Sequence, residues 1–160
     1  MKDKVFLFFI ICSMGLIACS DSALMDQNEA IKNKEWSSKQ IPEFIVPVKN
    51  NSSPYQFYLN LRNTVEYPFS NIFVLVHQQN PDKTQKTYRI KVILANREGL
   101  WLGKSAGNIF AHQVRFLKNV HLPDTGNYTF RIEHNMRLNP LPGINDVGLR
   151  IKPIEVEIKK

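Results

Sequence analysis

Cysteine is scarce in this chain: there are two, Cys12 and Cys19, and both lie close to the N-terminus. No later thiol is available for a disulfide bridge or for a metal site that uses cysteine. A folded domain in the rest of the chain must therefore be stabilised by its hydrophobic core. At 160 residues the chain is long enough for one domain that buries about two thirds of its unfolded surface.

Motifs of catalytic and metal sites are also missing. The four histidines, which are His77, His112, His121 and His134, form no HxH, HxxxH or HExxH spacing. Ser105 lies in GKSAG, which does not match the G-x-S-x-G pattern of a nucleophile elbow. Nothing singles out a carboxylate pair for glycoside chemistry. The sequence predicts a protein that is not an enzyme and has no catalytic, cofactor or metal site.

Long runs of like charge are absent, although the formal net charge is +7. The 21 lysines and arginines are scattered among 14 acidic residues, and no five like charges follow one another. Such scattering argues against a nucleic-acid partner. A moderate positive field close to anionic lipid is the functional alternative to simply solvated strand faces.

The longest apolar run is also short. Residues 5–18, VFLFFIICSMGLIA, follow the charged start MKDK. At about 1.5 Å per residue this run spans roughly 21 Å as a helix, less than the ~30 Å hydrocarbon core of a bilayer. A charged start, a short apolar run and small residues at its end are typical of a secretory signal peptide. We assign the signal peptide to residues 1–18.

The end of the apolar run, LIACSD, resembles the lipobox of bacterial lipoproteins. In such proteins the cysteine thiol takes a diacylglyceryl group and the cysteine becomes the first mature residue. The resemblance implies that lipid on Cys19 attaches the protein to a membrane. Ser20, and not an aspartate, follows Cys19, which favours the outer membrane and a periplasm-facing location. An ordinary signal peptide cut near Ala18 and an uncleaved anchor are the alternatives.

Two regions follow the lipobox. Residues 19–40 are mostly polar, with isolated apolar residues such as Trp36, and we interpret them as a lipidated N-terminus and tether. Residues 41–160 alternate between apolar and polar positions over short stretches. The stretches predicted as strands are 41–48, 55–63, 71–78, 87–94, 114–122, 128–133, 146–151 and 153–159.

Seven or eight short strands with turn residues between them predict an all-β domain, an antiparallel β-sandwich. Its connectivity is either jelly-roll or immunoglobulin-like. A closed barrel is disfavoured because Pro42, Pro47 and Pro153 suit the open edges of a sheet.

Aromatic residues in and beside two connections provide the candidate binding surface. Tyr67 and Phe69 precede the strand at residue 71, and Trp101 and Lys104 lie in the glycine-containing segment 99–108. Large aromatics at such positions either plug the ends of the core or stack on sugar rings. Because connections on a rigid scaffold often carry recognition, we expect both loops at one end of the sandwich, forming a partner surface.

Four segments resemble the GldH family of gliding motility lipoproteins. They are FYLNLRNTVEYPFSNIFVLV at 57–76, GLWLGKSAGNIF at 99–110, LPDTGNYTFRIEHNMR at 122–137 and GINDVGLRI at 143–151. The specific combination is N-L-R-N, Y-P-F-S-N, W-L-G-K, G-x-Y-x-F, M-R and D-V-G, in that order.

The resemblance implies a membrane-anchored accessory protein of the gliding motility and type IX secretion apparatus, without known catalysis or cofactor. Its partners would be other proteins of that apparatus, which it would help to assemble or stabilise. The alternative is a carbohydrate-binding surface lipoprotein that uses Tyr67, Phe69 and Trp101.

Overall fold

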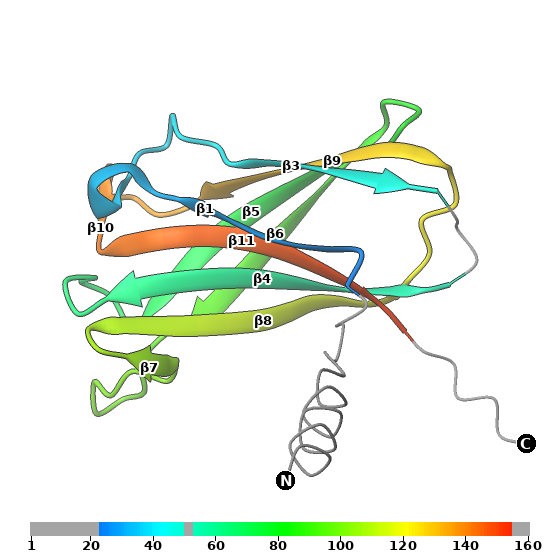
Figure 1. The fold of residues 1–160 in the computed structure, drawn as a ribbon. Helices are drawn as coiled ribbons and strands as arrows, with labels where there is room; N and C mark the ends of the chain where they lie inside the picture. The colour runs from blue at the N-terminus through cyan, green and yellow to red at the C-terminus, as the bar shows by residue number, and fades with distance from the viewer. Residues whose placement is uncertain (1–22, 50–52, 155–160) are drawn as a thin grey trace, which may run out of the picture.

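The computed structural model describes residues 23–49 and 53–154, which form two antiparallel β-sheets packed face to face (Figure 1). The predicted all-β sandwich is therefore confirmed. The predicted signal peptide and the lipidation site Cys19 lie outside the described residues. Within the described ranges, no helical segment has the length and hydrophobicity needed to cross a bilayer.

One sheet has five strands in the order β1-β11-β4-β8-β7. These strands are β1 (Met25–Ala30), β11 (Ile144–Pro153), β4 (Tyr55–Thr64), β8 (Ile109–Val120) and β7 (Lys104–Ala106). Each pair of neighbours is antiparallel. In β4 every second residue from Tyr55 to Asn63 is buried, which matches the predicted alternation.

The other sheet has four strands in the order β3-β9-β5-β6. They are β3 (Glu43–Val48), β9 (Gly126–His134), β5 (Asn71–Gln79) and β6 (Gln85–Ile93). As predicted, β5 is a central strand and β3, which contains Pro47, is an edge strand. A short pair, β2 (Glu35–Trp36) and β10 (Leu141–Pro142), follows the 3-10 turn η2 (Lys32–Lys34) at one end of the sandwich.

The inward faces of the two sheets form one core. Its largest fully buried side chains include Trp36, Tyr128, Phe57 and Phe130. The rings of Phe57 on β4 and Phe130 on β9 meet across the two sheets, with centroids 5.6 Å apart. Full burial of a large apolar side chain stabilises a fold by roughly 1.5–3 kcal/mol, so this core replaces the missing disulfides.

The tether predicted over residues 19–40 is shorter than expected, because residues 25–36 belong to the sandwich. Strand β1 pairs along its whole length with β11, from Met25↔Ile151 to Ala30↔Asp146. Trp36 is fully buried and its indole Nε1 donates a hydrogen bond to the Gln40 carbonyl at 2.9 Å. The predicted boundary at residue 41 therefore falls inside the folded domain.

The connection from β4 to β5 joins strands of different sheets. The chain crosses from one layer to the other, and Tyr67 N–H donates to the Thr64 carbonyl at 3.2 Å within the crossing. This crossing places residues 65–70 at an end of the sandwich.

The two ends of the sandwich differ in what they carry (Figure 1). At the end that we call the N-terminal end, β1 begins, β11 ends and β4 begins, as the pairs Met25↔Ile151 and Pro153↔Tyr55 show. At the opposite end, which we call the loop end, β4 ends and β8 begins beside the short strand β7.

Candidate functional site

The two connections predicted to form a surface lie together at the loop end. The carbonyl of Ser70, in the β4–β5 crossing, accepts hydrogen bonds from Leu94 N–H at 2.8 Å and Ala95 N–H at 3.1 Å. Ala95 in turn forms an isolated antiparallel bridge with Trp101. Because these contacts join both connections, the expected placement at one end is confirmed.

The first connection holds one buried and one exposed aromatic. Tyr67 is only 3% exposed, and its hydroxyl donates to the Asn71 carbonyl at 2.9 Å. Burial raises the pKa of the Tyr67 phenol. Phe69 is 39% exposed and meets the Tyr67 ring edge to face at 5.8 Å. Of the two aromatics predicted for the partner surface in this connection, Tyr67 is buried and supports the loop, and Phe69 is the exposed member.

The second connection presents apolar side chains that the sequence analysis did not select. Trp101 is half-buried, and its ring stacks on Phe110 of β8 at 5.4 Å. Its two neighbours are much more open, with Leu100 66% and Leu102 57% exposed. Lys104 is also exposed, at the start of β7. With Tyr67 buried and one face of the Trp101 ring covered by Phe110, Phe69 is the most exposed of the three aromatics considered for stacking on sugar.

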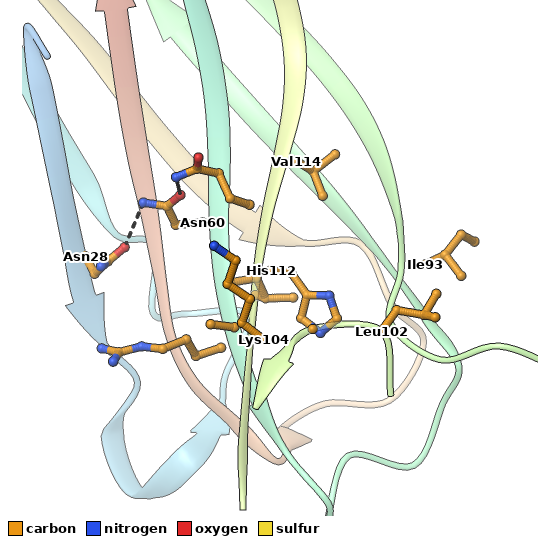
Figure 2. A pocket seen from close by; sticks show the side chains of 12 residues that line it. Asn28, Asn60, Ile93, Leu102, Lys104, His112 and Val114 are labelled. Atoms are coloured by element: carbon orange, nitrogen blue, oxygen red, sulfur yellow. Dashed lines mark hydrogen bonds between the residues drawn. The ribbon is translucent and has the colours of Figure 1, made fainter. Parts of the chain in front are cut away.

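A groove of about 670 Å³ runs from the loop end onto the outer face of the five-stranded sheet (Figure 2). We call it the β4–β8 groove because these strands supply most of its wall. Its lining residues are Asn28, Asn60, Leu61, Arg62, Ile93, Leu102, Gly103, Lys104, Ala111, His112, Gln113 and Val114.

A row of three amides crosses the groove. Gln113 Nε2 donates to Asn60 Oδ1 at 2.9 Å, and Asn60 Nδ2 donates to Asn28 Oδ1 at 3.3 Å (Figure 2). The row passes over Gly148 of β11, which pairs with both Asn28 and Asn60. A side chain at position 148 would overlap the Asn28 amide oxygen and the Gln27 carbonyl oxygen. The lack of a Cβ at Gly148 therefore lets the amides of β1, β4 and β8 meet over β11.

An ion pair lies beside this row. Arg62 of β4 contacts the carboxylate of Asp146 on the neighbouring strand β11 through two nitrogens, Nε at 2.8 Å and a terminal nitrogen at 2.6 Å. The Asp146 side chain is 3% exposed and that of Arg62 is 46% exposed. The hydrogen bond to Asp146 raises the pKa of the guanidinium. The buried carboxylate thus fixes Arg62 with part of its guanidinium facing solvent.

A buried histidine closes the inner side of the groove. A ring nitrogen of His112, Nε2, lies 3.0 Å from Oδ1 of the buried Asn63. Burial lowers the pKa of His112 and so favours its neutral form. The backbone of Gly103 packs against the imidazole, since a Cβ there would lie 2.7 Å from Nε2. Only glycine fits this contact without displacing the ring.

Three of the motifs quoted from the sequence therefore meet at one place. N-L-R-N supplies residues 60–63, W-L-G-K supplies residues 101–104, and D-V-G supplies residues 146–148. Sequence reasoning named only Trp101 and Lys104 from this set. It missed Asn60, Arg62 and Asp146 as site residues, because their meeting depends on the register of β4 against β11.

The groove presents hydrogen-bonding and cationic side chains. Across residues 23–49 and 53–154, no three His, Cys, Asp or Glu side chains are grouped to hold a metal ion. His112 has an amide partner and no neighbouring hydroxyl or thiol nucleophile that the described contacts show. The groove offers amides, the guanidinium of Arg62 and the exposed ammonium group of Lys104, which are groups that bind polar or anionic ligands.

Comparisons with known proteins agree with the motifs. Residues 23–151 match the profile of the GldH lipoprotein family. The chain is 26% identical over 160 residues to a gliding motility lipoprotein GldH homolog of Christiangramia forsetii, covering 95% of this chain and 98% of the relative. It is 25% identical over 159 residues to gliding motility lipoprotein GldH of Flavobacterium johnsoniae, with the same coverage.

Among solved structures, a carbohydrate-binding module specific for non-crystalline cellulose superposes with a TM-score of 0.41 at 10% identity. That match covers 82% of this chain and 74% of the module. The family match spans most of the described sandwich, and both relatives align over nearly their full length. The chain belongs to the GldH lipoprotein family.

Proposed function

We propose that this protein is a non-enzymatic, lipid-anchored envelope component of the gliding motility and type IX secretion apparatus. It supports the assembly or stability of partner proteins there. Family membership and the names of both relatives support the motility assignment. The observation that carries the binding role is a set of exposed apolar side chains at the loop end, Phe69, Leu100 and Leu102, which we call the apolar cluster. The loop end lies opposite the end where the described chain begins.

The position of the N-terminus orients the domain. The described chain starts at residue 23, and Leu24 N–H already donates to the Ile151 carbonyl at the N-terminal end. With lipid on Cys19, this end faces the membrane and the loop end points away from it (Figure 1). A protein partner in the periplasm therefore meets the loop end first.

Apolar exposure at the loop end fits a protein partner. Leu100, Leu102 and Phe69 are exposed on the two joined connections, and Lys104 lies beside them. Exposed apolar groups with a polar rim mark protein interaction sites, and truncation of a few such anchors often removes most of the binding energy.

The anchoring part of the proposal is tested on Cys19. Cys19→Ser removes the sulfur nucleophile, so a clickable fatty acid should label the wild-type protein and leave the variant dark. An equally labelled variant contradicts the lipid anchor. For the periplasm-facing location in the outer membrane, protease added to intact cells should leave the protein uncut. Its loss from unbroken cells contradicts that location.

The partner role is tested by co-purification from detergent-solubilised membranes with a C-terminal epitope tag. Wild type should recover other motility lipoproteins or secretion-ring components. Leu102→Glu should lose them, because it places a charge in the apolar cluster without opening a cavity. Lys49→Glu, an exposed change after β3, is the matched control and should retain them. Retention of the same partners by Leu102→Glu would reject the loop end as the interface.

A further inference from the structure

The outer face of the five-stranded sheet carries rows of polar side chains, of which the partner role uses only Lys104. Three neighbouring rows cross the strands at residues paired in register: Asp146–Arg62–Ala111–Lys104, Asn28–Gly148–Asn60–Gln113, and Asp26–Arg150–Tyr58–Arg115. Hydrogen bonds within and between the rows join Arg62 to Asp146, Asn60 to its neighbours Asp26, Asn28 and Gln113, and Arg150 to Asp26. These bonded side chains are therefore held in place before any ligand arrives.

The central amide row has groups left over for a ligand. Asn60 Nδ2 donates to Asp26 Oδ1 at 3.1 Å and to Asn28 Oδ1 at 3.3 Å, which uses both of its hydrogens. Asn60 Oδ1 accepts from Gln113 Nε2. The Asn28 Nδ2 donor and the Gln113 Oε1 acceptor stand at the two ends of the row, on exposed residues. A bound molecule meets a donor and an acceptor at a spacing set by the strands.

The charges beside this row select an anion. A guanidinium has five N–H groups, and the Asp146 carboxylate engages Arg62 through two nitrogens, so the remaining N–H groups are available. Lys104 forms no ion pair with any described residue, and in Figure 2 its side chain extends towards the amide row. Across the three rows, the cations Arg62, Lys104, Arg115 and Arg150 outnumber the two carboxylates.

The composition of the face favours a sugar over a protein segment. Protein interfaces rely on buried apolar and aromatic anchors, whereas the amide row of this face has none. Amides both donate and accept, as sugar hydroxyls do. Tyr58, half-buried between Arg150 and Arg115 in the third row, is the one aromatic ring available for a sugar to cover.

We infer that the β4–β8 groove and the adjoining sheet face bind a carboxylate-bearing oligosaccharide of the uronic acid class. Sugar hydroxyls bond to the amide row of Asn28, Asn60 and Gln113, and the carboxylate lies between Arg62 and Lys104. This site adjoins the apolar cluster of the loop end and shares Leu102 with it, whereas the amide row lies outside that cluster. The protein therefore carries a glycan site in addition to its partner surface.

The test is calorimetric binding to the full-length lipoprotein in detergent, with oligogalacturonate as the probe. Wild type should bind it, and Gln113→Ala and Asn28→Ala should each weaken binding by about threefold to tenfold, the value of one hydrogen bond. Lys104→Gln should weaken it similarly. Lys86→Gln, an exposed change on the other sheet, is the control and should bind as wild type. Melting temperatures confirm that each variant is folded.

Two further probes separate sugar recognition from simple charge. Maltohexaose, which has the hydroxyls and no carboxylate, should bind more weakly than oligogalacturonate, and poly-glutamate should bind without sensitivity to Gln113→Ala. The inference is overturned if oligogalacturonate does not bind, if maltohexaose binds as tightly, or if Gln113→Ala and Asn28→Ala leave its affinity unchanged. Asn28 and Gln113 lie outside the apolar cluster, so Asn28→Ala and Gln113→Ala should retain the partners in co-purification, and loss of glycan binding is thereby distinguished from loss of partner binding.

Discussion

The N-terminal segment, residues 25–36, and the loop segment, residues 99–108, each hold one tryptophan in opposite surroundings. Trp36 is fully buried, donates to the Gln40 carbonyl, and meets the His134 ring edge-on at 5.4 Å. Trp101 is half-buried and its ring is covered on one side by Phe110 of the next strand. One tryptophan completes the core, and the other supports a surface.

The difference extends to the neighbours of each tryptophan. In the N-terminal segment the apolar residues Met25 and Ile31 are buried, and the polar ones face solvent. In the loop segment Leu100 and Leu102 stay in solvent. A polar-looking segment can therefore be structural, while an apolar-looking loop is available for binding. The predictions below test this contrast between the N-terminal segment and the loop segment.

The largest expected effect comes from the two tryptophans themselves. Trp36→Ala should lower the free energy of unfolding by about 3–5 kcal/mol, because it empties a closed site in the core. Trp101→Ala should cost about 1–2 kcal/mol, since it loses a ring stack and part of its burial. Urea denaturation of both variants measures the gap. Equal losses of unfolding free energy in the two variants would contradict the different roles assigned to the two tryptophans.

Substitution of two glycines should have the next largest effect on the free energy of unfolding. Gly148→Ala should destabilise the fold by about 1–3 kcal/mol, because the added methyl overlaps the Gln27 carbonyl and forces β1 away from β11. Gly107→Ala, in the loop segment, meets no atom within 4 Å but has a φ of +63°, and should cost about 1 kcal/mol. Hydrogen exchange should show faster opening of β1 in the first variant and unchanged protection there in the second.

Acid should weaken the fold through its two buried histidines. Burial lowers the pKa of His134, beside Trp36, and of His112, beneath the loop segment, from 6.5. Below pH 6.5 the unfolded chain takes up these protons while the folded one resists them, so stability is complete above that pH and falls as the pH drops. Melting temperatures between pH 7 and pH 5 should decline.

A variant separates the two histidines in that decline. His134→Phe keeps a ring against Trp36 and removes one titrating group, so its melting temperature should depend less steeply on pH than that of wild type. An unchanged slope would assign the pH dependence elsewhere. His112→Gln, which retains a polar contact for Asn63, is the parallel variant for the loop end.

The smallest effect on stability is expected at Lys104. Lys104→Glu changes an exposed charge and should alter the free energy of unfolding by less than about 0.5 kcal/mol. If Lys104 belongs to the partner surface, the same variant should lose partners in co-purification from solubilised membranes. Unfolding of this variant would contradict the exposed placement of β7.

Much of the sandwich was predictable because its strands alternate. Phe57, Leu59 and Leu61 point inward as their spacing predicts, since one face of β4 is buried and the other is not. Strand β1 was missed because only Met25 among its six residues is buried. As an edge strand held by backbone pairing to β11, it carries no apolar alternation for sequence reasoning to detect.

The candidate site was less predictable than the fold. Loop aromatics were selected on type alone, and burial decided against Tyr67 while favouring its neighbour Phe69. Arg62 and Asp146 are 84 residues apart in sequence and meet only through strand pairing. Both residues lie in motifs recognised in the sequence, Arg62 in N-L-R-N and Asp146 in D-V-G. A motif does not indicate which of its residues contact residues of another motif.

The early start of the fold sets the radius within which the protein can act. Four residues separate Cys19 from Leu24, so a lipid on Cys19 would keep Leu24, where the described sandwich begins, within about 18 Å of the bilayer surface at full extension. A tether that ran to residue 40 would have let the domain search a far larger volume. A tether this short would confine the domain to the membrane surface. Its encounters with partners in the same membrane would then be two-dimensional and would occur at a high effective concentration. Partners, and any glycan, must come to the membrane to be bound.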